Sequence, residues 1–120
     1  KRLGPAEVES ILVEHESVIE SAAIGVPHPV KGSAVVVFAV LGAGVVANDE
    51  LKSELRNMVA TAMGKPLSPQ EILFISDLPK TRNGKVMRRM IRSAYLGLDL
   101  GDTSALVNGA VLEEVEGMKV

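Results

Sequence analysis

The sequence contains no cysteine and no tryptophan, and among its 120 residues only one is tyrosine and two are phenylalanine. Without cysteine the chain cannot form disulfides or thiolate metal sites, and it has no thiol nucleophile. This composition fits a cytoplasmic protein. Hydrophobic residues still make up 47% of the chain. The sequence therefore predicts a single domain, residues 1–120, with a core of aliphatic side chains.

Long apolar segments are also missing. The longest, Ala34–Leu41, is far too short to span a bilayer, and no signal peptide opens the chain. We therefore expect no membrane partner. The chain begins without methionine, at Lys1-Arg2-Leu3-Gly4, as if it were cut from a longer protein. Its formal net charge of −2 argues against a protein that binds nucleic acid through bulk positive charge.

Local patterns predict alternating helices and strands. The continuous β-branched run 34–41 is typical of a central strand buried on both faces. Asn48 is a suitable N-cap for the helix that follows, and Gly64 ends that helix. The predicted elements are a helix over 5–15, strands over 18–26 and 34–41, a helix over 49–63, a strand over 71–76, a helix over 86–96 and a short last helix over 111–118. Residues 97–109 are weakly patterned, and we treat 97–120 as a tail. The order predicts a small α+β fold, with a three-stranded sheet packed against helices.

The most informative stretch is Pro79–Arg89. Asn83-Gly84 is a turn signal, and Lys85 is expected to leave this turn at the start of a helix. Six of the 13 Lys and Arg residues lie between Lys80 and Arg92, and there is no Asp or Glu from Leu78 to Leu98. In the predicted helix one face carries Lys85, Arg88, Arg89 and Arg92. A positive field that no neighbouring carboxylate neutralises suits a polyanion such as a nucleotide phosphate.

Such a stripe is ordinarily the solvated face of an amphipathic helix. A second alternative is a nucleic-acid-binding module that uses the cationic helix. The lack of aromatic stacking residues near the stripe argues against binding of single strands. A phosphate-binding P-loop is excluded, because Pro79 and Val86 stand where that motif needs Gly and Ser or Thr. The position of Lys85 favours a ligand, since a helix N-terminus disfavours a cation.

Other polar residues give weaker signals. His15 and His28 have no partner at metal-ligand spacing, so structural roles are expected for both. No serine has a recognisable base partner, which leaves nucleophilic catalysis without support. The glutamates around the first helix, Glu9 among them, are expected to be solvated.

Three segments and the tail carry a family resemblance. Pro79–Arg89 resembles the last core motif of the adenylate-forming enzymes, the superfamily of acyl-CoA synthetases, peptide-synthetase adenylation domains and luciferases. Arg2–Ser10 resembles the end of the motif that begins their C-terminal domain. Val26–Gly32 resembles the segment between the first two strands of that domain. Gly101–Leu106 resembles the tail of acetyl- and propionyl-CoA synthetases.

The resemblance implies the mobile C-terminal lid domain of an AMP-forming acyl-CoA synthetase, whose partner is the large N-terminal domain of the same chain. Such an enzyme joins a carboxylic acid, here expected to be short-chain, to ATP with Mg²⁺, releases pyrophosphate and transfers the acyl group to CoA. The fragment alone is expected to be inactive. An adenylation domain that acts on a carrier-protein thiol is the alternative within the superfamily. A stand-alone structural domain is the alternative outside it.

The resemblance also implies roles for particular residues. Lys85 matches the adenylation lysine, and Gly84 would leave room for the nucleotide. Arg2 matches the arginine that contacts the adenylate phosphate. Lys85 also matches the lysine that acetyltransferases silence in this family, which makes a lysine acetyltransferase and a deacetylase expected partners.

Two further positions come from the acetyl-CoA synthetases. Their backbone cation site matches Val13, His15 and Val18. Their arginine near the end of the second helix, which helps to hold CoA, is replaced here by Ala60. The CoA contacts are therefore undetermined, with Arg56, one turn earlier, as the candidate substitute, and the replacement argues against a plain acetyl-CoA synthetase.

Overall fold

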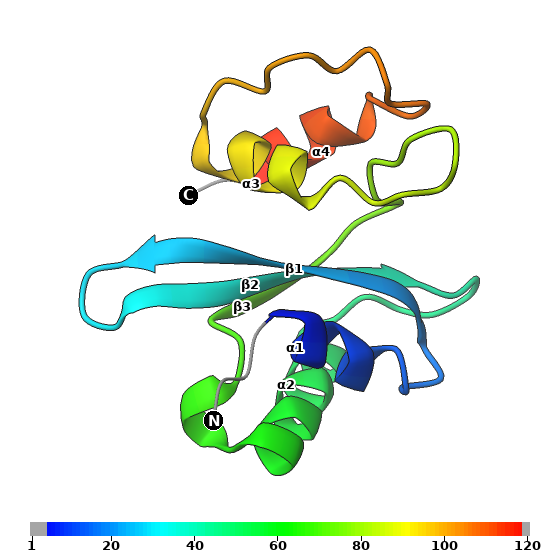
Figure 1. Ribbon diagram of the computed structural model, residues 1–120. Coiled ribbons are helices and arrows are strands. Elements are labelled where there is room, and N and C mark those ends of the chain that lie inside the picture. The colour runs from blue at the N-terminus through cyan, green and yellow to red at the C-terminus, as the bar shows by residue number, and fades with distance from the viewer. Residues whose placement is uncertain (1–4, 119–120) are drawn as a thin grey trace.

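A three-stranded sheet lies between two layers of helices in the computed structural model, which describes residues 5–118 (Figure 1). Strand β1 (Val18–His28) runs antiparallel to β2 (Gly32–Leu41), and β2 runs parallel to β3 (Glu71–Phe74). The strand order is β1-β2-β3. The predicted α+β fold with a three-stranded sheet is confirmed, and β2 is its central strand.

Strand β2 is buried on both faces, as its β-branched run predicts. Because side chains alternate along a strand, it contributes to two hydrophobic cores. Val36 and Phe38 belong to the core between the sheet and helices α3 and α4. Val37 and Ala39 belong to the core on the opposite face, against α1 and α2.

The first layer consists of α1 (Pro5–Leu12) and α2 (Asp49–Met63), followed by the short 3₁₀ helix η1 (Lys65–Leu67). The predicted cap of α2 is confirmed, since the side chain of Asn48 accepts a hydrogen bond from the Leu51 N–H at 2.8 Å. The helix ends at Gly64, whose φ of +99° favours glycine.

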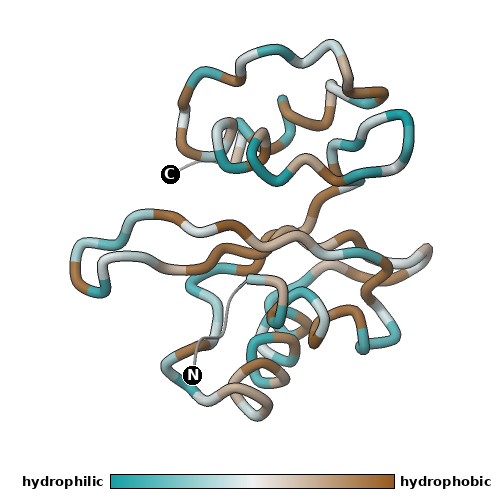
Figure 2. Tube along the Cα trace, in the orientation of Figure 1, coloured by the Kyte–Doolittle hydropathy of each residue, from teal (hydrophilic) through white to brown (hydrophobic). Residues whose placement is uncertain are grey.

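The second layer consists of α3 (Arg88–Leu96) and α4 (Val111–Met118). Helix α3 buries Met90, Ile91 and Ala94 beneath its cationic face. Its Tyr95 packs edge-on against Phe38 of the sheet, with ring centroids 5.6 Å apart. In Figure 2 the strands are largely brown, while the segment that leads into α3 is mostly teal. Among residues 5–118, no helix has both the length and the apolar character needed to cross a membrane.

Helix α3 begins later than predicted, at Arg88 rather than residue 86. Residues 86 and 87 belong to a hairpin instead. Val86 forms an antiparallel bridge with Lys80, and the Met87 N–H donates to the Pro79 carbonyl at 2.9 Å. Lys85 therefore lies in a loop and not on the helix, so the predicted four-residue stripe is wrong at its first member.

Two other elements are shorter than predicted. Helix α1 ends at Leu12 rather than residue 15, because residues 13–17 turn toward β1. Strand β3 ends at Phe74 rather than residue 76. Beyond it, the Ser76 N–H donates to the Glu114 carboxylate of α4 at 3.1 Å, which draws the chain away from the sheet.

Candidate active site

The Lys85 loop, defined as residues 79–87, is a hairpin closed by its own hydrogen bonds. The Thr81 N–H donates to the Lys85 carbonyl at 3.0 Å, and the Lys85 N–H donates to the Thr81 hydroxyl at 3.2 Å. Gly84 completes the tip with a φ of +85°, and its N–H donates to the Thr81 carbonyl at 2.9 Å. These bonds fix the backbone of Lys85 although the tip is exposed.

The side chain of Lys85 points into an open environment. The residue is exposed, and within residues 5–118 its ammonium forms no ion pair. A Cβ atom at Gly84 would meet nothing within 4 Å, so the positive φ is the reason for glycine within this chain. As far as the described residues show, the loop thus presents one ammonium without an ion pair, on a backbone held by hydrogen bonds.

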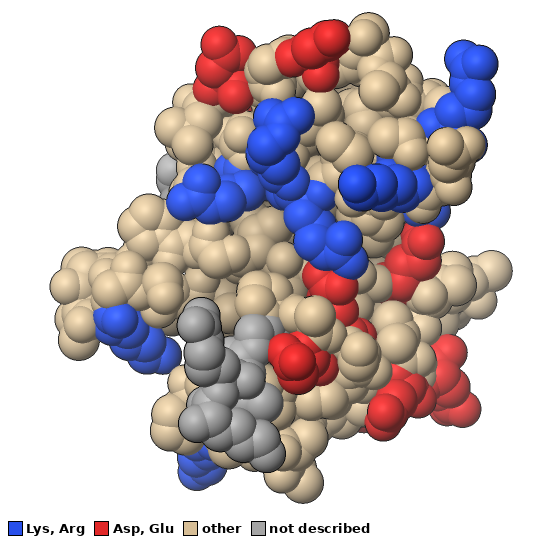
Figure 3. All heavy atoms as spheres, in the orientation of Figure 1, with Lys and Arg blue, Asp and Glu red and all other residues tan. Residues whose placement is uncertain are grey.

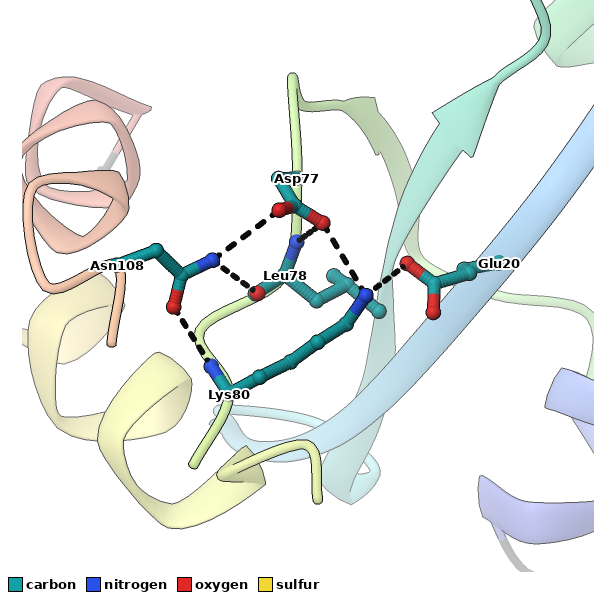
Figure 4. Close-up of polar contacts among 5 residues, drawn as sticks. All are labelled: Glu20, Asp77, Leu78, Lys80 and Asn108. Carbon is teal, nitrogen blue, oxygen red and sulfur yellow. Dashed lines mark hydrogen bonds and ion pairs between the residues drawn. The ribbon is translucent and has the colours of Figure 1, made fainter. Parts of the chain in front are cut away.

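Lys80, in the same loop, has the opposite environment (Figure 4). Its ammonium donates to Glu20 of β1 at 2.8 Å and lies 3.4 Å from Asp77. The hydrogen bond to Glu20 is the main cause that raises the pKa of Lys80 above its ordinary value, against the opposing effect of burial. Lys80 is therefore bound within the protein, while Lys85 is available to a ligand.

The first arginine of α3 is also neutralised. Two nitrogens of Arg88 donate to the two oxygens of Glu9, each at 2.6 Å, in a bidentate ion pair. These hydrogen bonds raise the pKa of Arg88. Glu9 also accepts the Ala23 N–H at 2.7 Å, and its side chain is only 13% exposed. The predictions that Glu9 is solvated and that no carboxylate neutralises the stripe are both wrong here.

What remains of the stripe is a smaller cationic surface, made of Arg82, Lys85 and Arg89. All three are exposed and, in the described part of the chain, none forms an ion pair. Arg92 is directed elsewhere, since its Nε donates to the Gly25 carbonyl at 2.8 Å. Figure 3 shows Lys and Arg side chains gathered over the α3 layer, with carboxylates both above and below them.

The other predicted site residues lie away from the loop or outside the described chain. Arg2 lies outside the described residues. Val13, His15 and Val18 lie in and beside the turn from α1 to β1, where the His15 carbonyl accepts the Val18 N–H at 3.1 Å. Residues 5–118 contain no group of three His, Asp or Glu side chains that could hold a metal ion. The backbone cation site stays a prediction, and we assign no side-chain ligand for Mg²⁺.

Both histidines support turns. The Nδ1 atom of His15 accepts the Ser17 N–H at 3.0 Å, and that of His28 accepts two backbone N–H groups of the β1–β2 turn. Ala60 lies on α2 as predicted, and Arg56 directs its Nη2 toward the Gln70 carbonyl at 3.4 Å. The CoA contacts stay undetermined.

Sequence reasoning missed the residues that hold the loop and α3 in place. These are Glu9, Glu20 and Asn108, whose partners lie 79, 60 and 28 residues away in the chain. A local pattern cannot show contacts at such separations. The one available signal was the acid-free stretch around the loop, which requires carboxylates from elsewhere if its cations are to be paired.

Residues 7–85, which end at the exposed lysine of the loop, match the sequence model of the AMP-binding enzyme C-terminal domain. The chain belongs to this family. It is also 46% identical over 115 residues to the acetyl-coenzyme A synthetase of Gemmatimonas aurantiaca. That match covers 96% of the chain but 18% of the relative. The chain thus spans about a fifth of the length of the relative.

Solved structures agree with this assignment. The acyl-CoA synthetase of Brucella canis superposes with a TM-score of 0.73 and 38% identity, over 78% of this chain and 17% of that chain. The acetoacetyl-CoA synthetase of Streptomyces lividans superposes with a TM-score of 0.82 over 98% of this chain and 18% of that chain. Its identity is 19%, so this second match supports the fold alone.

Proposed function

We propose that the chain is the C-terminal lid of an AMP-forming acyl-CoA synthetase and that Lys85 is its adenylation lysine. The observation that carries the proposal is the contrast within the Lys85 loop. Lys80 is held by two carboxylates, whereas Lys85 is exposed, forms no ion pair with any residue of 5–118, and lies on a backbone fixed by hydrogen bonds. A preorganised, unpaired cation is what stabilises charge that builds up in a transition state.

In the first half-reaction, an oxygen of the substrate carboxylate attacks the α-phosphorus of ATP. The bond from that phosphorus to the bridging oxygen breaks, and pyrophosphate leaves with the bonding electrons. The Lys85 ammonium would bridge the attacking carboxylate and the phosphate oxygens. It acts by position and charge and transfers no proton.

In the second half-reaction, the deprotonated sulfur of CoA attacks the acyl carbon, the bond from that carbon to the phosphate oxygen breaks, and AMP leaves with the bonding electrons. The lid would then have turned Lys85 away from the nucleotide. ATP, the acid and most of CoA would be held by the large N-terminal domain, because this chain corresponds to only about 18% of a full-length relative. Within the proposal Arg2 contacts the adenylate phosphate, Mg²⁺ accompanies ATP, and the acid is short-chain, as the name of that relative suggests.

The test uses the complete enzyme and separates the half-reactions. Lys85→Ala should lower carboxylate-dependent pyrophosphate exchange a few hundredfold, equivalent to about 3–4 kcal/mol. Thioester formation from supplied acyl-adenylate should stay unchanged. Lys31→Ala, another exposed lysine, is the matched control and should affect neither step. Equal loss of both steps, or no loss of the first, would refute the proposed role. Acetate, propionate and longer acids in the same assay identify the substrate.

We further propose that Lys85 is a site of regulatory acetylation. The modification needs an accessible amine, and the ion pairs of Lys80 leave Lys85 as the accessible lysine of the loop. Acetylation removes the positive charge that adenylation would use. After treatment with a lysine acetyltransferase and acetyl-CoA, mass spectrometry should find acetyl-Lys85 and unmodified Lys80, with loss of pyrophosphate exchange. A deacetylase should restore exchange. Acetylation of Lys85 that leaves the exchange rate intact would contradict the proposal.

A further inference from the structure

The segment that precedes α4 runs alongside the base of the Lys85 loop. Leu106 pairs with Thr81 in an isolated antiparallel bridge, and the Val107 N–H donates to the Lys80 carbonyl at 3.0 Å. This segment belongs to the tail that the sequence predicts as weakly patterned. It also lies beyond residues 7–85, the part that matches the family model. The loop is therefore supported by residues that the matched segment does not include.

Asn108 directs its whole side-chain amide at the segment that enters the loop (Figure 4). Its Oδ1 accepts the Lys80 N–H at 2.9 Å. Its Nδ2 donates to the Leu78 carbonyl at 2.8 Å and to the Asp77 carboxylate at 3.2 Å. One side chain thus forms hydrogen bonds to three residues of the segment that leads into the hairpin, and a neutral amide is suited to this because it both donates and accepts.

These contacts hold the arm of the hairpin that contains Lys80 and Thr81, which lies opposite the arm that carries Lys85. With Val107, Asn108 satisfies both backbone groups of Lys80, which pairs with Val86 across the hairpin. Helix α4 adds a second attachment just upstream, where Ser76 donates from its N–H and its hydroxyl to Glu114, at 3.1 and 2.6 Å. The tail therefore fixes the direction in which the loop leaves the body of the protein.

We propose that Asn108 is a positioning residue for Lys85 and that residues 106–108 serve as a clamp on the adenylation loop. The inference rests on the proposed function. Positioning matters because the lysine must meet a developing charge at close range, and a displacement of about 1 Å can cost roughly a hundredfold in rate. Asn108 acts through the backbone of the loop and does not contact the reacting atoms.

The experiment compares Asn108→Ala, Asn108→Ser and Val107→Ala in the complete enzyme. Asn108→Ala should lower pyrophosphate exchange about tenfold or more, with thioester formation from supplied acyl-adenylate unchanged. Asn108→Ser replaces the amide with a hydroxyl that can still donate and accept a hydrogen bond, so its activity should fall between wild type and Ala, and it carries the test if the alanine variant does not fold. Val107→Ala is the control, because it leaves the backbone N–H bond to Lys80 in place.

Two readouts separate positioning from a merely structural role. Hydrogen exchange of the peptide that contains residues 79–87 should accelerate in Asn108→Ala, without faster exchange in the sheet. In a Lys85→Ala background, Asn108→Ala should have no further effect on pyrophosphate exchange. The inference would be overturned if Asn108→Ala lowered both half-reactions equally, or if its loss added to that of Lys85→Ala in the double variant. Unchanged hydrogen exchange of residues 79–87 in Asn108→Ala would also overturn it. If Lys85→Ala itself retains full activity, the proposed function fails instead, so the two failures are distinguishable.

Discussion

Two lysines of one short loop show how residue environment divides structural from chemical roles. Both side chains are long, cationic and adjacent to a turn. The sequence distinguishes them only by their positions in the motif and cannot show which groups surround each ammonium. The structure gives Lys80 two carboxylates and leaves Lys85 without an ion pair in the part of the chain that it describes. Lys80 stabilises the fold through its ion pairs with carboxylates of the same chain. Lys85 must remain accessible if it is to bind an anion and act on it.

At this scale we predict that Lys80→Met destabilises the protein by about 1 kcal/mol near neutral pH, the upper end of the range for ion pairs at the surface, because this pair is partly buried. The folded-state pKa of Lys80 is raised above its ordinary value of 10.5, mainly by Glu20. Its contribution is therefore fully present below pH 10.5 and is lost as the pH rises through the higher folded-state pKa.

Urea unfolding of the wild type and the variant over a pH series checks this prediction. The difference in unfolding free energy should stay constant from neutral pH to about pH 9 and shrink above the ordinary lysine pKa. Lys31→Met, at an exposed lysine outside any ion pair of the described chain, is the control. A difference that grows with alkaline pH would contradict the assigned role of the ion pair.

At the scale of elements, the sequence predicts best where a pattern is local. The N-cap at Asn48 and the buried run of β2 each depend on residues close together in the chain, and both are confirmed. The predicted start of a helix is wrong where its backbone groups form hydrogen bonds with another segment instead of within the helix. Residues 86 and 87 fit a helical pattern, but their pairing with Lys80 and Pro79 in the hairpin delays the start of α3.

The same reasoning explains what was predictable in the candidate site. Lys85 and Gly84 are identified because their motif is contiguous, and the predicted turn at Asn83-Gly84 is present. The neutralisation of Arg88 was not predictable, because Glu9 lies 79 residues away on another element. The bidentate pair joins α1, in one layer, to α3, in the other. Arg88, which the sequence places in the cationic stripe, is thus part of the connection between the layers.

At the scale of the whole molecule, the proposed role as a lid that turns between two positions requires the chain to move as one body. The two helical layers bury separate cores on opposite faces of the sheet, which could in principle unfold separately. They share β2, however, whose alternate side chains enter both cores, and the Arg88–Glu9 pair also joins them. Loss of either core should therefore remove the strand on which the other is built.

We accordingly predict that a cavity in one core lowers the stability of both. Val37 is fully buried in the core against α1 and α2, so Val37→Ala should cost roughly 2 kcal/mol for the lost methyl groups and the cavity. Tyr95, the only tyrosine in a chain without tryptophan, lies in the other core and reports on it by fluorescence. During urea unfolding, tyrosine fluorescence and circular dichroism should give coincident transitions in both proteins, shifted together to lower urea in the variant.

Val46→Ala, at a residue that is 70% exposed, is the control and should leave the midpoint unchanged. If the fluorescence transition stayed in place while the circular dichroism transition moved, the layers would be independent, and the sheet could not transmit a rigid rotation from one layer to the loop that carries Lys85.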